Sequence, residues 1–193
     1  FANRMDLDNP KATCITAGPL YNMEFRYQQH QAMLNAVEKI KAADKAFGET
    51  FGRSYGGVVE AYKCDDAEAI LITLGSVAGT TRCVVDEMRE QGKKVGLLKI
   101  RCMRPFPAKE IVEIVKNAKF VGVLEKDVSF GFEGVVYTDV SSALKSAGVE
   151  ESFARTALTN AGDSSPPNFF ASSTASLIAT RSGISSSYFI SYT

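Results

Sequence analysis

The chain has 193 residues, of which 45% are hydrophobic and 23% are charged, as expected for one globular domain with room for an appendage. Its 22 basic and 22 acidic side chains leave no net charge, so neither nucleic acid nor an anionic membrane is an expected partner. No window approaches the roughly 20 apolar residues that a membrane-spanning helix needs. Composition therefore favours a globular domain that works away from membranes and nucleic acid.

The chain starts at Phe1 rather than at an initiator Met, and residues 2–4 do not open the apolar core of a signal peptide. We therefore expect a piece of a longer protein, with a domain upstream. Asn9-Pro10 and Gly18-Pro19 are turn signals without a helical period. Residues 1–21 are accordingly predicted to form a connector.

A long amphipathic helix is predicted from Asn22, because apolar residues recur there at spacings of three and four while charged residues fall largely on the other side. Gly48 and Gly52 are predicted to end this helix. The apolar positions are Phe25, Met33, Leu34, Val37, Ile40 and Phe47. Residues 1–62 are thus assigned to the connector and this helix.

Residues 63–150 alternate buried strands with helices. Residues 69–74, 94–100 and 120–124 are apolar runs typical of strands buried on both faces, and the first of them should be central. Helices are predicted after each run, the last of them over 135–147. The segment is therefore predicted to be an α/β fold: a small three-layer domain with a mainly parallel sheet flanked by helices.

The composition changes near Glu150. No Lys follows Lys145, and Ser and Thr crowd the remainder of the chain. Such a stretch has little apolar periodicity to offset an ordering entropy of roughly 1 to 2 kcal/mol per residue. Residues 151–193 are predicted to be a largely disordered tail, with a short element over 169–178 as the tolerated exception.

The cysteines lie far apart and form no Cys-x-x-Cys pair, and the one histidine is His30. This spacing predicts structural or free thiols, and no metal ligand is assigned. Two of the four fall inside a predicted helix and strand, which suits small buried residues in the reducing cytoplasm. The four are Cys14, Cys64, Cys83 and Cys102.

One candidate contact site is the loop that joins the first strand to its helix. The backbone N–H groups there, with the hydroxyl groups of Ser76 and Thr80, could hold an anion at the positive end of the helix. The loop matches neither Gly-x-Gly-x-x-Gly nor the phosphate loop that closes on Gly-Lys-Ser/Thr. Ser and Thr are also ordinary helix caps, and we favour the capping interpretation. The candidate residues are Gly75, Ser76, Gly79 and Thr80.

Arg101 and Arg104 flank a strand end at the edge where open α/β sheets bind ligands, which makes Arg104 a candidate anion contact. A salt bridge from Arg104 to Glu125 or Asp127 is the interpretation we favour. With His30 as the one imidazole, no Ser-His-Asp or Cys-His set can be assembled. No catalytic residue is therefore assigned.

Four separated segments carry a resemblance to a known family: Met23 to Gln29, Ile72 to Thr80, Arg101 to Pro107 and Asp127 to Gly131. Together they resemble the α subunit of 2-oxoacid:ferredoxin oxidoreductases of the pyruvate or branched-chain type. The resemblance covers about Asp8 to Lys145, and it falls on the second domain of that subunit, which is similar to the C-terminal domain of transketolase.

The resemblance implies a complex that decarboxylates a 2-oxoacid on thiamine diphosphate, passes electrons through [4Fe–4S] clusters to ferredoxin, and transfers the acyl group to coenzyme A. The implied partners are an upstream thiamine-pyrimidine domain, a β subunit and iron–sulfur subunits. This chain has neither a Gly-Asp-Gly diphosphate motif nor cluster cysteines, so no cofactor-binding residue is carried over. Its implied role is structural, with the loop from Gly75 to Thr80 and the segment Arg104, Phe106 and Pro107 as interface elements.

From about Glu151 the chain departs from the family pattern, which suggests a shifted reading frame or a divergent end. Two other functions stay open. One is a stand-alone module that binds a phosphate-bearing ligand at the loop from Gly75 to Thr80. The other is the matching domain of a transketolase or of a 2-oxoacid dehydrogenase that does not use ferredoxin.

Overall fold

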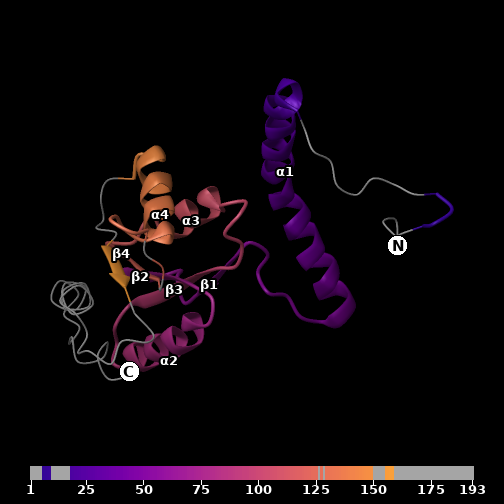
Figure 1. The fold of residues 1–193 in the computed structure, drawn as a ribbon. Coiled ribbons are helices and arrows are strands. Elements are labelled where there is room, and N and C mark those ends of the chain that lie inside the picture. Colours follow the sequence, from indigo (N-terminus) through magenta and orange to yellow (C-terminus); the bar gives the residue numbers. More distant parts are fainter. Residues whose placement is uncertain (1–5, 10–17, 126, 128, 150–154, 159–193) are drawn as a thin grey trace. The chain divides into compact units, whose positions relative to one another are not determined.

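The structure is a computed structural model that describes residues 6–9, 18–125, 127 and 129–149, and the backbone of residues 155–158 (Figure 1). The chain divides into two compact units, residues 1–36 and residues 37–193. Each unit is described by itself.

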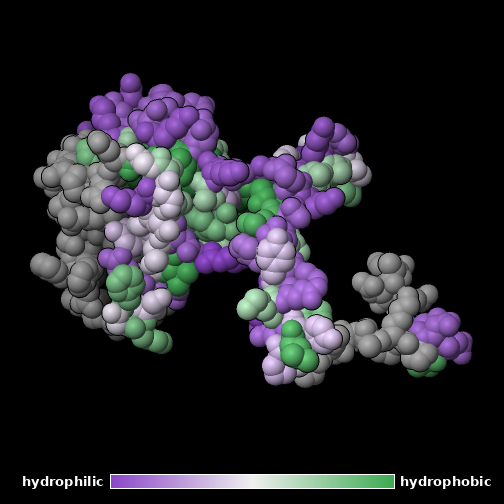
Figure 2. All heavy atoms as spheres, turned by 90° about the horizontal axis from the view of Figure 1, so that it is seen from above, coloured by the Kyte–Doolittle hydropathy of each residue, from purple (hydrophilic) through white to green (hydrophobic). Residues whose placement is uncertain are grey.

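The long helix α1 spans Pro19–Phe51 and confirms the predicted helix. It begins earlier than the predicted start at Asn22, because proline is well suited to the first helical position. It also runs through Gly48 and ends before Gly52, whose φ of 68° suits a residue without a side chain. No residue of α1 is buried, and Figure 2 shows hydrophobic and hydrophilic side chains side by side on its surface.

The sheet has five strands in the order β1-β3-β2-β4-β5. Strands β3, β2, β4 and β5 are parallel to their neighbours, while β1 pairs with β3 in the antiparallel sense. The prediction of a mainly parallel sheet with residues 69–74 at its centre is confirmed. The strands are β1 (Val59–Tyr62), β2 (Ala69–Leu74), β3 (Val95–Ile100), β4 (Phe120–Glu125) and β5 (Arg155–Leu158).

Helices cover both faces of the sheet, so the predicted three layers are confirmed. Figure 1 shows α3 (Ala108–Val115) and α4 (Val135–Ser146) on one face, and α2 (Val77–Glu90) on the other. Pro107 is the N-cap residue of α3, and Gly92, with φ of 79°, follows the end of α2.

Two apolar clusters hold these layers together. Alternate β2 residues enter different clusters: Ile70 and Ile72 pack with α3 and α4, while Ala69 packs with α2. On the first face the helices contribute Ile111, Val115, Val136, Val140 and Leu144; on the second, α2 contributes Ala78, Val85 and Met88. The central strand is thus buried on both faces, as its continuous apolar run predicts.

The cysteines correct one expectation. Cys83 is exposed on α2, and Cys102 is only half-buried because it lies after β3 rather than within it. Cys64 is the buried one, and burial raises the pKa of its thiol. Cys14 lies outside the described residues.

The strand β5 lies within the segment for which the sequence predicts a disordered tail. Its residues pair in parallel with β4, from Gly122 opposite Arg155 to Glu125 opposite Leu158. The expectation of disorder is therefore wrong for 155–158, and the tolerated element at 169–178 lies outside the described residues. Among the described residues, no helix is long and apolar enough to cross a membrane.

Candidate functional site at the strand ends

The candidate residues gather at the edge of the sheet where the parallel strands end. Leu74 of β2 lies opposite Ile100 of β3, and Thr73 lies opposite Leu124 of β4. The segments that follow these strands therefore leave the sheet at one edge, which is the edge where open α/β sheets place ligands.

The loop after β2 is short and open. Gly75 has φ of 75°, which favours glycine, and α2 begins at Val77, so Gly79 and Thr80 lie in its first turn rather than in a loop. A Cβ added at Gly79 would meet nothing within 4 Å. Gly75, Ser76, Gly79 and Thr80 are all exposed.

The predicted capping role is not seen at this helix start. Ser76 occupies the N-cap position but has helical φ and ψ of −69° and −28°, and its side chain makes no cap hydrogen bond. The N–H group of Ala78 instead donates to the Gly75 carbonyl at 3.4 Å, and the N–H group of Gly79 donates to the Ser76 carbonyl at 3.1 Å. Two N–H groups that an anion would need are therefore already engaged.

Arg104 has a different partner from the one the sequence suggests. Its Nη1 lies 2.6 Å from Oδ2 of Asp139, which α4 supplies, and it also donates to the Met103 carbonyl at 2.8 Å. The guanidinium lies 5.9 Å from the centre of the Phe106 ring. The expected salt bridge to Glu125 or Asp127 is therefore wrong, since Arg104 joins the loop after β3 to α4.

The segment after Arg104 turns into the core. Pro107 is fully buried, and Phe106 is half-buried against the cluster beneath α3 and α4. The peptide bond between Arg104 and Pro105 is cis. Phe106 and Pro107 therefore anchor this loop, while the Arg104 side chain is the part that reaches the surface.

Glu125 holds the start of α4. The residue is 5% exposed, and its carboxylate accepts hydrogen bonds from the N–H groups of Val136 at 2.9 Å and Tyr137 at 3.0 Å. These are free N–H groups of a helix N-terminus, where a negative charge is favourable. A Cβ added at Gly134 would overlap this carboxylate, so a larger residue there would have to displace the carboxylate from its hydrogen bonds.

Arg101 joins the start of the loop after β3 to the C-terminal part of α1. Its Nη1 lies 3.5 Å from Oδ1 of Asp44 and donates to the Gly57 carbonyl at 3.2 Å. Hydrogen bonds from the Ser54 hydroxyl and the Tyr55 N–H group lower the pKa of Asp44. The hollow beside Asp44 and Arg101 is otherwise lined by Ile40, Phe47, Tyr55 and Gly57, and its two charged groups are paired with each other.

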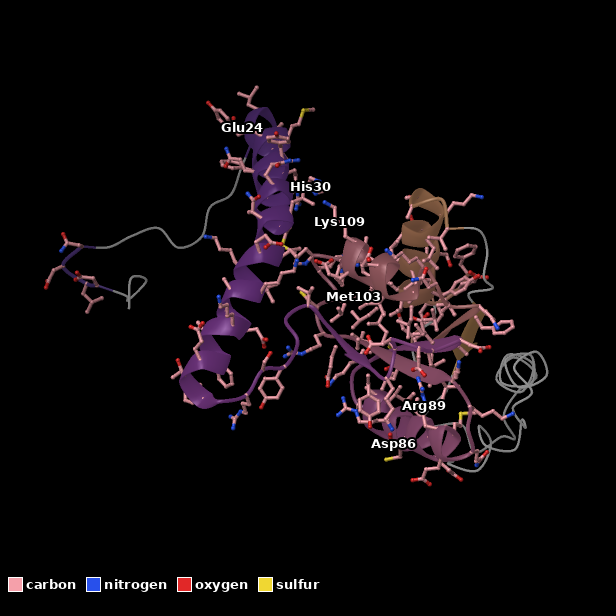
Figure 3. All side chains as sticks on the ribbon, turned by 180° about the vertical axis from the view of Figure 1, so that it is seen from behind. Glu24, His30, Asp86, Arg89, Met103 and Lys109 are labelled. Carbon is pink, nitrogen blue, oxygen red and sulfur yellow. The ribbon has the colours of Figure 1, made fainter. Side chains whose placement is uncertain are left out.

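The polar side chains of α2 are engaged with the neighbouring strands and loops. Asp86 accepts a hydrogen bond from the Tyr62 hydroxyl at 2.7 Å, which raises the pKa of that hydroxyl, and it pairs with Lys63. Arg89 donates to the Val95 carbonyl at 2.7 Å and pairs with Asp66 at 2.8 Å (Figure 3). These groups bind α2 to the sheet.

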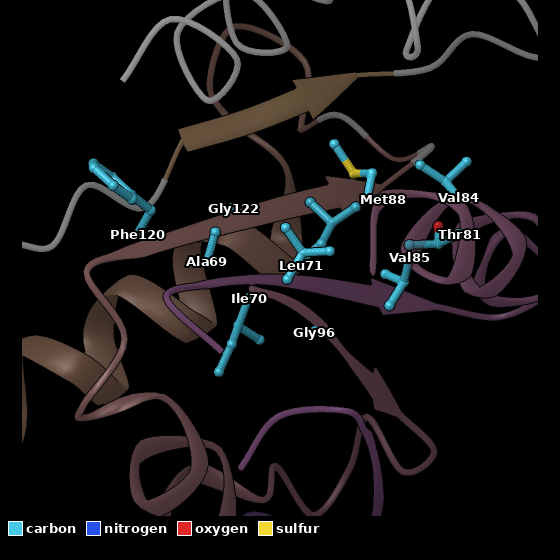
Figure 4. Close-up of a pocket in the computed structure, with 11 residues that line it drawn as sticks. Ala69, Ile70, Leu71, Thr81, Val84, Val85, Met88, Gly96, Phe120 and Gly122 are labelled. Carbon is cyan, nitrogen blue, oxygen red and sulfur yellow. The ribbon is translucent and has the colours of Figure 1, made fainter. Parts of the chain in front are cut away.

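A second hollow lies between α2 and the sheet (Figure 4). Leu71, Val84, Met88 and Phe120 line it. Thr81 also lines it, but its hydroxyl group donates a hydrogen bond to the Val77 carbonyl. Such a lining offers no group to orient a polar ligand. Within the described part of the chain, no three His, Cys, Asp or Glu side chains could hold a metal ion.

Sequence reasoning missed two carboxylates, Asp139 and Asp44, and it gave Glu125 the wrong partner. Asp139 and Asp44 fall inside helices, where they resemble solvated charges. Glu125 carries a usable signal, because a strand-end acid followed by a glycine just before a helix is compatible with capping from a distance.

Comparison with known proteins identifies the family to which this chain is similar. Residues 67–164 match the family described as pyruvate:ferredoxin oxidoreductase core domain II. The match extends beyond residue 150, near which the sequence suggested that the family pattern ends, and it includes β5.

Curated relatives agree. Over 141 residues the chain is 47% identical to pyruvate synthase subunit PorA of Methanothermobacter thermautotrophicus, covering 73% of this chain and 37% of that protein. Over 144 residues it is 40% identical to ketoisovalerate oxidoreductase subunit VorA of Pyrococcus horikoshii, covering 75% and 36%. The chain thus spans little more than a third of the length of these relatives.

Among solved structures, the chain is similar to 2-oxoglutarate:ferredoxin oxidoreductase from Magnetococcus marinus. The TM-score is 0.48 at 17% identity, and the likeness covers 84% of this chain and 24% of that chain.

Proposed function

Because this chain belongs to the pyruvate:ferredoxin oxidoreductase core domain II family, we propose that it is part of the α subunit of a thiamine diphosphate-dependent 2-oxoacid:ferredoxin oxidoreductase. The whole enzyme would oxidatively decarboxylate pyruvate or a related 2-oxoacid to acyl-CoA. The family match carries this proposal, and relatives named as pyruvate synthase and ketoisovalerate oxidoreductase subunits support it.

The share of this chain is structural rather than catalytic. A [4Fe–4S] cluster needs converging thiolates, but Cys64 is buried with its Sγ 3.3 Å from the Leu97 carbonyl, and Cys83 is exposed on α2. The Cys102 Sγ–H group donates a hydrogen bond to the Arg104 carbonyl oxygen at 3.2 Å. The described residues therefore do not fit a cluster, and we assign no cluster ligand to them.

The described residues do not fit a diphosphate either. The hollow beneath α2 is aliphatic and aromatic, and the one beside Asp44 and Arg101 has its charges paired. We therefore propose that other parts of the complex bind thiamine diphosphate, the clusters and coenzyme A. These parts would be an upstream thiamine-pyrimidine domain, a β subunit and iron–sulfur subunits, with ferredoxin as the electron acceptor.

The interface role falls on the exposed strand-end groups. Gly75, Ser76, Gly79 and Thr80 offer a small, open surface at the start of α2, which suits the close approach of another backbone. Arg104 is held by Asp139 at the same edge. Free cysteines among the described residues also support a reducing cytoplasm as the place of action.

A deletion and replacement experiment tests the proposal. The portion of the Methanothermobacter thermautotrophicus subunit that matches this chain is deleted, or is replaced by this chain to give a chimaera. Each protein is co-expressed with the other subunits. We expect pyruvate-dependent reduction of ferredoxin to be lost in the deletion and restored in the chimaera. The isolated chain should show no turnover, and a chimaera that neither assembles nor reduces ferredoxin would contradict the proposal.

A further inference from the structure

The first unit of the chain carries large apolar side chains that face solvent along α1. Leu20 is 90% exposed, Met23 85%, Tyr27 64% and Leu34 54%. At 3.6 residues per turn, these four positions fall within about 60° of one another around the helix. They form one stripe, called the N-terminal stripe below.

The two parts of α1 differ in charge. Between residues 19 and 36 the charged side chains are Glu24 and Arg26, which cancel. Between residues 37 and 51 charged side chains are frequent, at Glu38, Lys39, Lys41, Asp44, Lys45 and Glu49. A helix part with so few charges and so many exposed apolar side chains is expected to be covered by protein.

Other occupants fit the N-terminal stripe less well. A second copy of the chain would need an apolar heptad sustained over three or four repeats, but the stripe is interrupted at His30 and Gln31 and reaches Glu38 and Lys41 beyond Leu34. A membrane surface would need a basic polar face, and this helix part is neutral.

The match to relatives indicates which protein covers the stripe. The family match begins at residue 67, so α1 lies outside the matched domain. The relatives are nearly three times as long as the part that this chain matches, and that extra polypeptide is tethered to the same chain. Tethering makes even a modest apolar interface effective, because docking is then intramolecular.

We propose that the N-terminal stripe is the docking surface for another folded domain of the same α polypeptide. The inference rests on the proposed function, since it takes the rest of that polypeptide from the relatives. Docking would order a helix part that cannot bury apolar surface by itself, and it would fix the matched domain to its neighbour through α1.

Hydrogen–deuterium exchange tests this docking. The amides of residues 19–36 should exchange at least about tenfold more slowly in the chimaera than in the isolated chain. The double variant Tyr27→Glu and Leu34→Glu should lose that protection. The matched control Gln28→Glu and Asn35→Glu places the same two charges one residue further along and should keep it, as should Leu34→Met.

Equal exchange in the chimaera and the isolated chain would overturn the inference, and so would equal behaviour of the two double variants. Protection in the isolated chain that rises with its concentration would also overturn it, in favour of a second copy. Ferredoxin reduction separates the two proposals: an active chimaera without protection refutes the docking alone, whereas a protected chimaera that stays inactive refutes the proposed activity.

Discussion

The segments that leave the strand ends differ in how they are fastened. The segments after β3 and β4 are tied down by Arg101 to Asp44, by Arg104 to Asp139 and by Glu125 to the start of α4. Among the residues that the structure describes, no such side-chain tie reaches the loop after β2, and Ser76 does not cap its helix. The difference indicates that one part of this edge maintains the fold, while the open loop is free to contact another protein.

The largest expected effect comes from adding a methyl group at the fastened part. Gly134→Ala would place a Cβ on the Glu125 carboxylate and displace it from the Val136 and Tyr137 N–H groups. We expect a loss of about 3 kcal/mol in the free energy of unfolding, measured by urea denaturation. The control Gly79→Ala meets nothing within 4 Å and should stabilise α2 by about 0.5 to 1 kcal/mol. Equal effects of the two substitutions would contradict the comparison.

Acid should loosen the tie between Asp44 and Arg101. Hydrogen bonds from Ser54 and Tyr55 lower the pKa of Asp44 in the folded chain below its ordinary 3.8. The stabilisation is therefore present above the unfolded-state pKa and is lost as the pH falls through the folded-state pKa. Urea midpoints taken from neutral pH downward should converge for wild type and Asp44→Asn. A constant gap at all pH values would argue against this carboxylate as the acid-sensitive group.

A smaller effect is expected at the ion pair of Arg104. The Arg104 side chain is 54% exposed and that of Asp139 is 25% exposed, so solvent screens their attraction. A double-mutant cycle with Arg104→Ala and Asp139→Ala should give a coupling of about 0.5 kcal/mol. A coupling energy near zero would show that the Arg104–Asp139 pair does not help to hold the segment after β3 in place.

The smallest effect is expected in the open loop. Ser76→Ala removes a hydroxyl that makes no cap hydrogen bond, so the free energy of unfolding should change by less than about 0.5 kcal/mol. Thermal unfolding measures this. A loss of about 1 kcal/mol or more would show that the Ser76 side chain caps α2 in solution.

Local patterns predict most of the elements, because each strand and helix carries its own signal. The apolar runs at β2, β3 and β4 are buried as predicted. The helix α1 shows the limit of such signals, since Gly48 does not interrupt it. A glycine costs a helix only about 1 kcal/mol, which the neighbouring turns can offset.

The candidate site was less predictable, because its contacts join residues far apart in sequence. Arg104 had acids available at Glu125 and Asp127, but the packing of α4 brings Asp139 to it instead. The Glu125 carboxylate instead accepts a hydrogen bond from the Val136 N–H group at the start of α4. The strand β5 has too weak an apolar pattern to stand out, and pairing with β4 forms it.

Gly79→Glu in the chimaera tests most directly whether the open loop serves assembly. Glutamate is a better helix former than glycine, its charge favours a helix start, and it meets no neighbour here, so the free energy of unfolding of the isolated chain should not fall below that of wild type. Sedimentation should show at least about tenfold weaker association of the variant with the partner subunits. Association equal to that of wild type would contradict the account.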